Sequence, residues 1–122
     1  MAATFTKIPL SGGGNDGLGI LVVATATTGT TIHTASSTAT TVDELWLYAF
    51  NSDTSAINLS IEFGGVTSPK DVIKSAIPAE SGLTLICAGL IIQGNATAKI
   101  VRAFAGTASK ISIFGYVNRI TA

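Results

Sequence analysis

The sequence is poor in the side chains that carry out catalysis. Its 122 residues include one histidine, one cysteine and seven carboxylates, and charged residues make up 11% of the chain. An ordinary soluble domain has about 25% charged residues. Acid–base and nucleophilic chemistry needs titratable groups held beside one another, and few are present here. We therefore expect a structural or binding role rather than an enzyme.

An excess of charge of one sign is also missing. Seven basic residues balance seven acidic ones, so there is no electrostatic footprint for nucleic acid or for an anionic membrane. No apolar run approaches the roughly 20 residues of a membrane-spanning helix, and residues 1–10 lack the pattern of a signal peptide. The sequence predicts synthesis in a cytoplasm and no nucleic-acid or membrane partner. A net charge of zero also gives little protection against self-association.

The single cysteine and the single histidine each allow two interpretations. Cys87 lies in an apolar run, which favours a small buried side chain over a reactive thiol. For His33, the nearest carboxylates in sequence are Asp43 and Glu44, at a spacing that indicates no site on a strand and loop. We expect a surface or interface histidine; a small hydrolase that depends on His33 is the alternative. No cofactor or metal motif is present in the sequence.

Glycine is concentrated near the start of the chain. Five of the nine residues from 11 to 19 are glycine, which disfavours both helix and strand, and the Lys-Ser/Thr of a phosphate-binding loop does not follow. We predict that residues 1–19 form an extended, flexible N-terminal arm and linker, and that residues 20–122 form one β-sandwich domain. The arm carries three apolar side chains that we expect to contact a partner: Phe5, Ile8 and Leu10.

The remaining sequence is typical of short β-strands. Residues 57–63 alternate strictly, with the four apolar side chains predicted to point inward and Asn58, Ser60 and Glu62 outward. About eight strands with no convincing helix predict an all-β fold, an antiparallel β-sandwich or a jelly-roll-like domain. Residues 106–109 predict a hairpin between the last two strands. The predicted strands cover residues 20–27, a short stretch around 32, 43–51, 57–63, 73–77, 83–88, 90–93, 98–105 and 110–120.

Aromatic residues are few, 7% of the chain, but they gather in two predicted strands. Trp46, Tyr48 and Phe50 alternate with aliphatic residues, so both faces of the strand at 43–51 are apolar. This pattern predicts a central strand covered on both faces, by core or by a neighbouring subunit. An exposed carbohydrate platform is the alternative. Phe114 and Tyr116 form an equivalent pair in the last predicted strand.

Five segments together resemble small structural proteins of tailed bacteriophages, specifically capsid decoration, or cement, proteins. The likeness covers residues 20–121, and the motifs are structural rather than catalytic. They are residues 43–51 (DELWLYAFN), 61–69 (IEFGGVTSP), 77–83 (IPAESGL), 101–105 (VRAFA) and 115–120 (GYVNRI).

The resemblance implies a β-sandwich that commonly forms trimers and sits on the outer capsid where major capsid protein subunits meet. The expected partners are therefore other copies of the chain and the major capsid protein, and the expected location is the virion. A phage tail or receptor-binding module that binds carbohydrate is the alternative. The interface residues predicted are Phe5, Ile8, Leu10, Trp46, Tyr48, Phe50, Phe114 and Tyr116.

Overall fold

The computed structural model of the chain describes residues 3–12 and 16–121. These residues form nine β-strands and, among them, no α-helix, which confirms the predicted all-β fold. The strands are β1 (Thr4–Pro9), β2 (Ile20–Val22), β3 (Thr30–Thr34), β4 (Thr41–Asn51), β5 (Ile57–Phe63), β6 (Val72–Ile77), β7 (Thr84–Gln93), β8 (Ile100–Ala105) and β9 (Ile111–Thr121).

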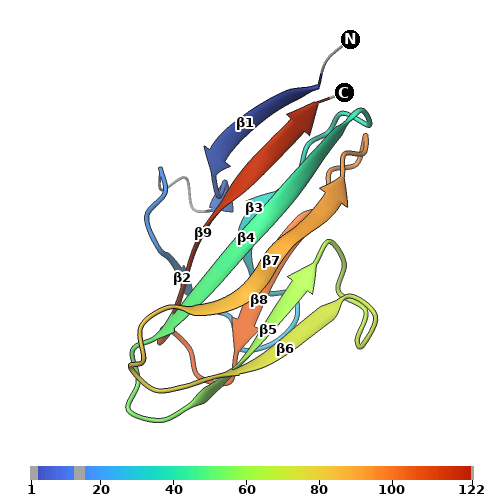
Figure 1. Ribbon diagram of the computed structural model, residues 1–122. Coiled ribbons are helices and arrows are strands. Elements are labelled where there is room, and N and C mark those ends of the chain that lie inside the picture. The colour runs from blue at the N-terminus through green and yellow to red at the C-terminus, as the bar shows by residue number, and fades with distance from the viewer. Residues whose placement is uncertain (1–2, 13–15, 122) are drawn as a thin grey trace.

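The strands pair into two antiparallel sheets that lie one behind the other (Figure 1). In sheet A the order is β1-β9-β4-β7, with β2 also paired to β9; in sheet B the order is β3-β8-β5-β6. Two connections between consecutive strands, β1 to β2 and β5 to β6, stay within one sheet. Every other connection crosses to the opposite sheet. This is the strand order of a jelly roll, one of the two predicted architectures.

Two details of the strand prediction were wrong. Residues 106–109 do not close a hairpin, because β8 belongs to sheet B and β9 to sheet A. The apolar faces of β8 and β9 thereby meet across the core instead of lying side by side. Gly89 does not divide two strands, because it is an extra residue within β7, where the register opposite β4 shifts. Such a bulge keeps a strand continuous while bending it.

The core lies between the sheets and follows the alternation of the sequence. Leu45, Leu47 and Ala49 of β4 are fully buried, as are the central apolar residues of β5. Cys87 is buried among them, as predicted, with its Sγ 3.3 Å from the carbonyl oxygen of Leu45. Burial raises the pKa of its thiol.

The N-terminal segment differs from the predicted flexible arm that contacts a partner. Residues 4–9 are extended, as strand β1, but they pair with residues 116–121 of β9 in the same chain. The short β2 covers only residues 111–113 of β9, so β1 satisfies a backbone edge that would otherwise be open. Residues 13–15 of the predicted linker lie outside the described residues.

The residues that follow β1 are anchored to the sandwich. Leu10 is 5% exposed and joins the hydrophobic core. Gly12 is buried so closely against β3 that a Cβ there would overlap the carbonyl oxygens of Thr31 and Ile32. Residues 4–12 therefore belong to the sandwich.

Candidate functional site

Five of the eight predicted interface residues lie together on the outer face of sheet A. In register, Trp46 of β4 lies opposite Tyr116 of β9, and Tyr48 lies opposite Phe114. Phe50 follows on the same face of β4, because the alternate residues of this strand are buried in the core. All five side chains are half-buried, so their apolar surface is partly accessible.

The rings pack on one another and on glycine. The Trp46 and Tyr116 rings stack with centroids 6.1 Å apart and planes 9° apart. A Cβ at Gly89 of β7 would lie 3.1 Å from the Trp46 ring, so the bulge glycine lets the indole lie flat over the neighbouring strand. The Lys7 ammonium lies 4.8 Å from the centre of the Tyr116 ring, a cation–π contact.

One carboxylate fixes the position of the indole. Glu44 Oε1 accepts hydrogen bonds from Trp46 Nε1 at 2.8 Å and from Asn118 Nδ2 at 2.9 Å. These bonds, the one from Asn118 foremost, hold the pKa of the Glu44 carboxyl below its usual value. The row of five aromatic side chains on sheet A, which we call the aromatic row, therefore has a defined orientation and polar groups at one end.

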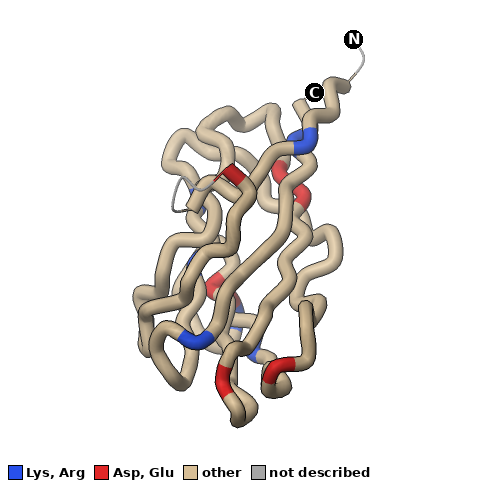
Figure 2. The backbone as a smooth tube through the Cα atoms, turned by 90° about the vertical axis from the view of Figure 1, so that its left-hand side faces the viewer, with Lys and Arg blue, Asp and Glu red and all other residues tan. Residues whose placement is uncertain are grey.

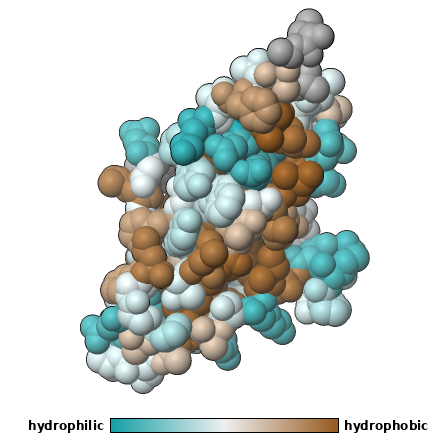
Figure 3. All heavy atoms as spheres, in the orientation of Figure 1, coloured by the Kyte–Doolittle hydropathy of each residue, from teal (hydrophilic) through white to brown (hydrophobic). Residues whose placement is uncertain are grey.

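Exposed aliphatic side chains extend the aromatic row toward both edges of the sheet (Figure 3). On β7 Leu85 is 51% exposed and Ile91 62%, and they lie opposite the outward-facing Tyr48 and Glu44 of β4; on β2 Leu21 is 47% exposed. We call these residues, with the five aromatic residues above, the apolar face of sheet A. Figure 2 shows that charged residues are few and scattered along the chain, without a cluster of one sign.

The three predicted interface residues of the N-terminal segment lie in different surroundings. Phe5 of β1 is 71% exposed. Ile8 is half-buried and packs against the core, and Leu10 is within the core. In this conformation Leu10 offers no surface to a partner.

His33, Asp43 and Arg119 form a buried polar network that the sequence did not predict. His33, predicted at the surface or an interface, is 0% exposed, and so is Asp43. His33 Nε2 lies 2.8 Å from Asp43 Oδ2. Arg119 donates to both carboxylate oxygens, from Nε to Oδ1 and from Nη2 to Oδ2, each at 2.8 Å. The backbone N–H of Ser11 donates to His33 Nδ1 at 3.2 Å.

Burial and hydrogen bonding set the charges in this network. Burial lowers the pKa of His33, and the hydrogen bond to Asp43 only partly offsets that effect. Burial alone would raise the pKa of Asp43, but hydrogen bonds from Arg119 and His33 outweigh it, and the pKa lies below its usual value. Since Ser11 N–H donates to Nδ1, the ring proton lies on Nε2 and faces Asp43.

Ser11, His33 and Asp43 contact one another in the spatial arrangement Ser–His–Asp of a hydrolase triad. Their other contacts favour a structural role. The Ser11 hydroxyl oxygen lies 3.2 Å from His33 Nδ1 and accepts the Thr34 N–H at 2.8 Å. Both Asp43 oxygens are engaged by Arg119, and the imidazole is sealed from solvent. The arrangement ties the segment after β1 to β3, β4 and β9.

The comparisons with known proteins identify no relative. No family model matches the chain, and neither a curated protein nor a solved structure matches it. Among the described residues no group of three or more histidine, cysteine or acidic side chains could hold a metal ion. The same residues include no helix that is long and apolar enough to cross a membrane.

Proposed function

We propose that the protein is a non-enzymatic capsid decoration protein of a tailed bacteriophage. It forms a trimer and binds the outer surface of the shell, where it stabilises contacts between major capsid protein subunits. The observation that carries this proposal is the apolar face of sheet A, on which partly exposed aromatic and aliphatic side chains lie together. The resemblance of residues 20–121 to capsid decoration proteins supplies the identity of the partner.

The size of this face suits a specific interface. Four strands about 4.8 Å apart, with β4 of 11 residues rising about 3.3 Å each, give a flat area of about 700 Å². A stable interface buries about 800 Å² on each partner, roughly one eighth of the 6227 Å² surface of this chain. One sheet face and its edge are therefore enough for one partner.

Strand β7 is the edge best suited to contact another copy. It has ten residues, TLICAGLIIQ, with no proline and no charge, and such edges pair readily with other strands. At the opposite edge, β1 carries Lys7 and Pro9, which discourage strand pairing. Since β1 pairs within its own chain, the proposal requires no exchange of an N-terminal arm.

Weak contacts suffice when many copies bind one shell. Once a copy is bound to a neighbouring copy, its capsid-binding surface is held close to the shell. The effective concentration for the second contact is therefore high, and the two contacts together bind more tightly than either alone. The balanced charge of the chain, seven basic against seven acidic residues, allows copies to lie side by side without long-range repulsion.

The test combines oligomer mass with capsid binding. The double variant Leu85→Lys/Ile91→Lys places two ammonium groups on the exposed side of β7. We expect the wild-type chain to form trimers in light scattering and to co-sediment with capsids of the phage that encodes it. The double variant is expected to be monomeric and to bind capsids at least about tenfold more weakly, a loss of about 1.4 kcal/mol.

Val66→Lys is the matched control, because Val66 is 44% exposed but lies in the turn between β5 and β6 of sheet B. It should leave both measurements unchanged. A wild-type chain that stays monomeric and does not sediment with capsids would contradict the proposal.

A receptor-binding module of a phage tail is the second candidate function. The stacked Trp46–Tyr116 pair, with the Glu44 carboxylate and the Asn118 amide at its margin, has the parts of a carbohydrate platform. Trp46 is the single tryptophan, so its fluorescence separates the two functions. Saturable quenching by a host glycan would favour the receptor module, and an unchanged signal favours capsid decoration.

A further inference from the structure

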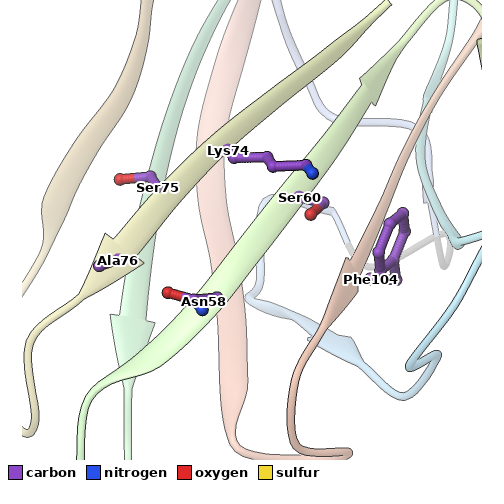
Figure 4. Close-up of a pocket in the computed structure, with 6 residues that line it drawn as sticks. All are labelled: Asn58, Ser60, Lys74, Ser75, Ala76 and Phe104. Carbon is purple, nitrogen blue, oxygen red and sulfur yellow. The ribbon is translucent and has the colours of Figure 1, made fainter. Parts of the chain in front are cut away.

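Sheet B carries a groove on its outer face that the proposed function does not use. A cavity of about 390 Å³ is bordered by β5, β6 and β8 (Figure 4). A second cavity of about 330 Å³ shares Lys74 and Phe104 with the first, so the two adjoin and form one groove. We call this the sheet B groove.

Strand register builds the centre of the groove. Ser60 of β5 lies opposite Phe104 of β8 on one side and opposite Lys74 of β6 on the other. Ser60 is 7% exposed and forms the floor. Figure 4 shows the Lys74 side chain reaching across β5 toward Phe104, with Asn58 further along the same strand. One aromatic ring and one ammonium group thus face each other across a hydroxyl.

A buried carboxylate fixes one end of the groove. Glu62, predicted to point outward, lies on the outer face of sheet B but is 0% exposed. Its Oε2 accepts a hydrogen bond from the Thr27 hydroxyl, and its Oε1 accepts one from the Gly29 N–H at 2.7 Å. These bonds hold the segment before β3 against β5, where Thr25 and Thr27 line the groove.

The free polar groups in the groove define what it can bind. Both oxygens of Glu62 are engaged, whereas Lys74 forms no salt bridge with any residue that the structure describes. The side chains of Asn58 and Ser60, on the outer face of β5, likewise form no hydrogen bond within the described part of the chain. The groove therefore offers one ammonium group outside any salt bridge, free hydroxyl and amide groups, and one aromatic face, while the Glu62 carboxylate at its end is held by two neutral donors.

These groups match a sugar ring that carries one carboxylate. The C–H face of a pyranose packs on an aromatic ring, and its hydroxyls pair with amide and hydroxyl side chains. One ammonium group then pairs with one carboxylate. A nucleotide phosphate calls for several cationic groups or a helix N-terminus, and an apolar ligand would leave the polar floor unpaired.

We propose that the sheet B groove binds an acidic glycan unit, with Phe104 stacked on the pyranose ring and Lys74 paired with the sugar carboxylate. This site is independent of the apolar face of sheet A, because it lies on the opposite sheet of the sandwich. Glycan binding and capsid binding can therefore succeed or fail separately.

The test uses two ligands that differ at one carbon. Methyl β-D-glucuronide carries a carboxylate where methyl β-D-glucoside carries a hydroxymethyl group. Binding is measured by saturation-transfer NMR and by titration of amide chemical shifts. A ligand of about 14 non-hydrogen atoms at ordinary efficiency binds with a Kd of about 1 mM. We expect that affinity for the glucuronide, and at least about tenfold weaker binding of the glucoside.

Two variants and one control locate the site. Lys74→Gln should weaken glucuronide binding about tenfold and leave glucoside binding unchanged. Phe104→Leu, which keeps an apolar side chain, should weaken both sugars. Lys110→Gln removes an ammonium group from an exposed residue outside the groove and should change neither.

Three outcomes would overturn the proposal. The first is equal affinity for the two sugars, and the second is an equal effect of Lys74→Gln and Lys110→Gln on glucuronide binding. The third is no binding of either sugar at about 20 mM, well above the expected Kd. Amide spectra of each variant verify folding, and the oligomer mass and capsid binding of Lys74→Gln should equal those of the wild type.

Discussion

Replacing Asp43 with asparagine tests the buried network at its centre. Asparagine has nearly the same shape, but one carboxylate oxygen becomes an NH2 donor. His33 and Arg119 together direct three donors at the two oxygens of Asp43. In either orientation of the new amide, at least one donor then faces another donor. Reversal of the histidine tautomer gives no relief, because the Ser11 N–H already occupies Nδ1.

The unfolding free energy that Asp43→Asn should cost follows from how deeply the network is buried. Breaking a fully buried ion pair costs about 3–5 kcal/mol. Asp43 and His33 are sealed from solvent, but the Arg119 side chain is 33% exposed and can still reach water, which places the loss near the lower end. We expect Asp43→Asn to lose about 3 kcal/mol of unfolding free energy, or a Tm about 10 °C lower in a domain of this size.

Urea denaturation followed by circular dichroism gives the free energy, and a thermal scan gives Tm. Hydrogen exchange adds a local readout, because the Ser11 amide should exchange faster in the variant. Asp53→Asn is the control, since Asp53 is only partly buried and accepts the Thr54 N–H at a surface turn. If Asp43→Asn cost no more than Asp53→Asn, the network would not hold the sandwich together.

Three further predictions concern pH, packing and the thiol. The lowered pKa of His33 means that the unfolded chain binds a proton near pH 6.5 when the folded chain does not. The free energy of unfolding should therefore fall as pH drops from about 7 to 5, by up to about 1.4 kcal/mol per pH unit. His33→Gln should make this free energy less dependent on pH. A wild-type free energy that does not change with pH would contradict the lowered pKa of His33. Loss of the Asp43 charge, whose pKa is also lowered, should add to the fall only below about pH 4. Gly115→Ala should cost about 3 kcal/mol in urea denaturation, because the new Cβ would overlap the Trp46 carbonyl oxygen; a neutral effect would refute that packing. Cys87, buried and with a raised pKa, should react with a thiol reagent only after urea is added, and rapid labelling of the folded protein would place it elsewhere.

Alternation along single strands was the part of the fold that the sequence predicted well. Leu45, Leu47 and Ala49 on one face, against Trp46 and Tyr48 on the other, define the two sides of β4, and the structure places them so. This succeeds because side-chain direction in a strand depends only on the parity of the residue number.

The contacts that the sequence did not predict are those that depend on which strands become neighbours. Arg119 lies 76 residues from Asp43, and the two meet only because β9 pairs with β4. A signal was nevertheless present: Asp43 has the parity of the buried Leu45, and Arg119 that of the buried Val117. A charge at an inward position requires a partner.

Short connections were ambiguous for a similar reason. The five residues that connect β8 to β9, 106–110, suit a hairpin and suit equally a crossing between stacked sheets. Only the pairing of β8 with β5 and of β9 with β4 decides which occurs. The sheet B groove could not be predicted for the same reason. Phe104, Ser60 and Lys74 lie side by side only because of the register in which β8, β5 and β6 pair.

The pairing of β1 with β9 has a practical consequence for protein engineering. Thr4 lies opposite Thr121, so a linker of a few residues could join the two ends of the chain. The joined molecule could be reopened at the exposed residues 106–109, giving a circular permutant with the same two sheets. In a tandem fusion, the linker would leave one sandwich and enter the next at the same rim, next to β1 and β9.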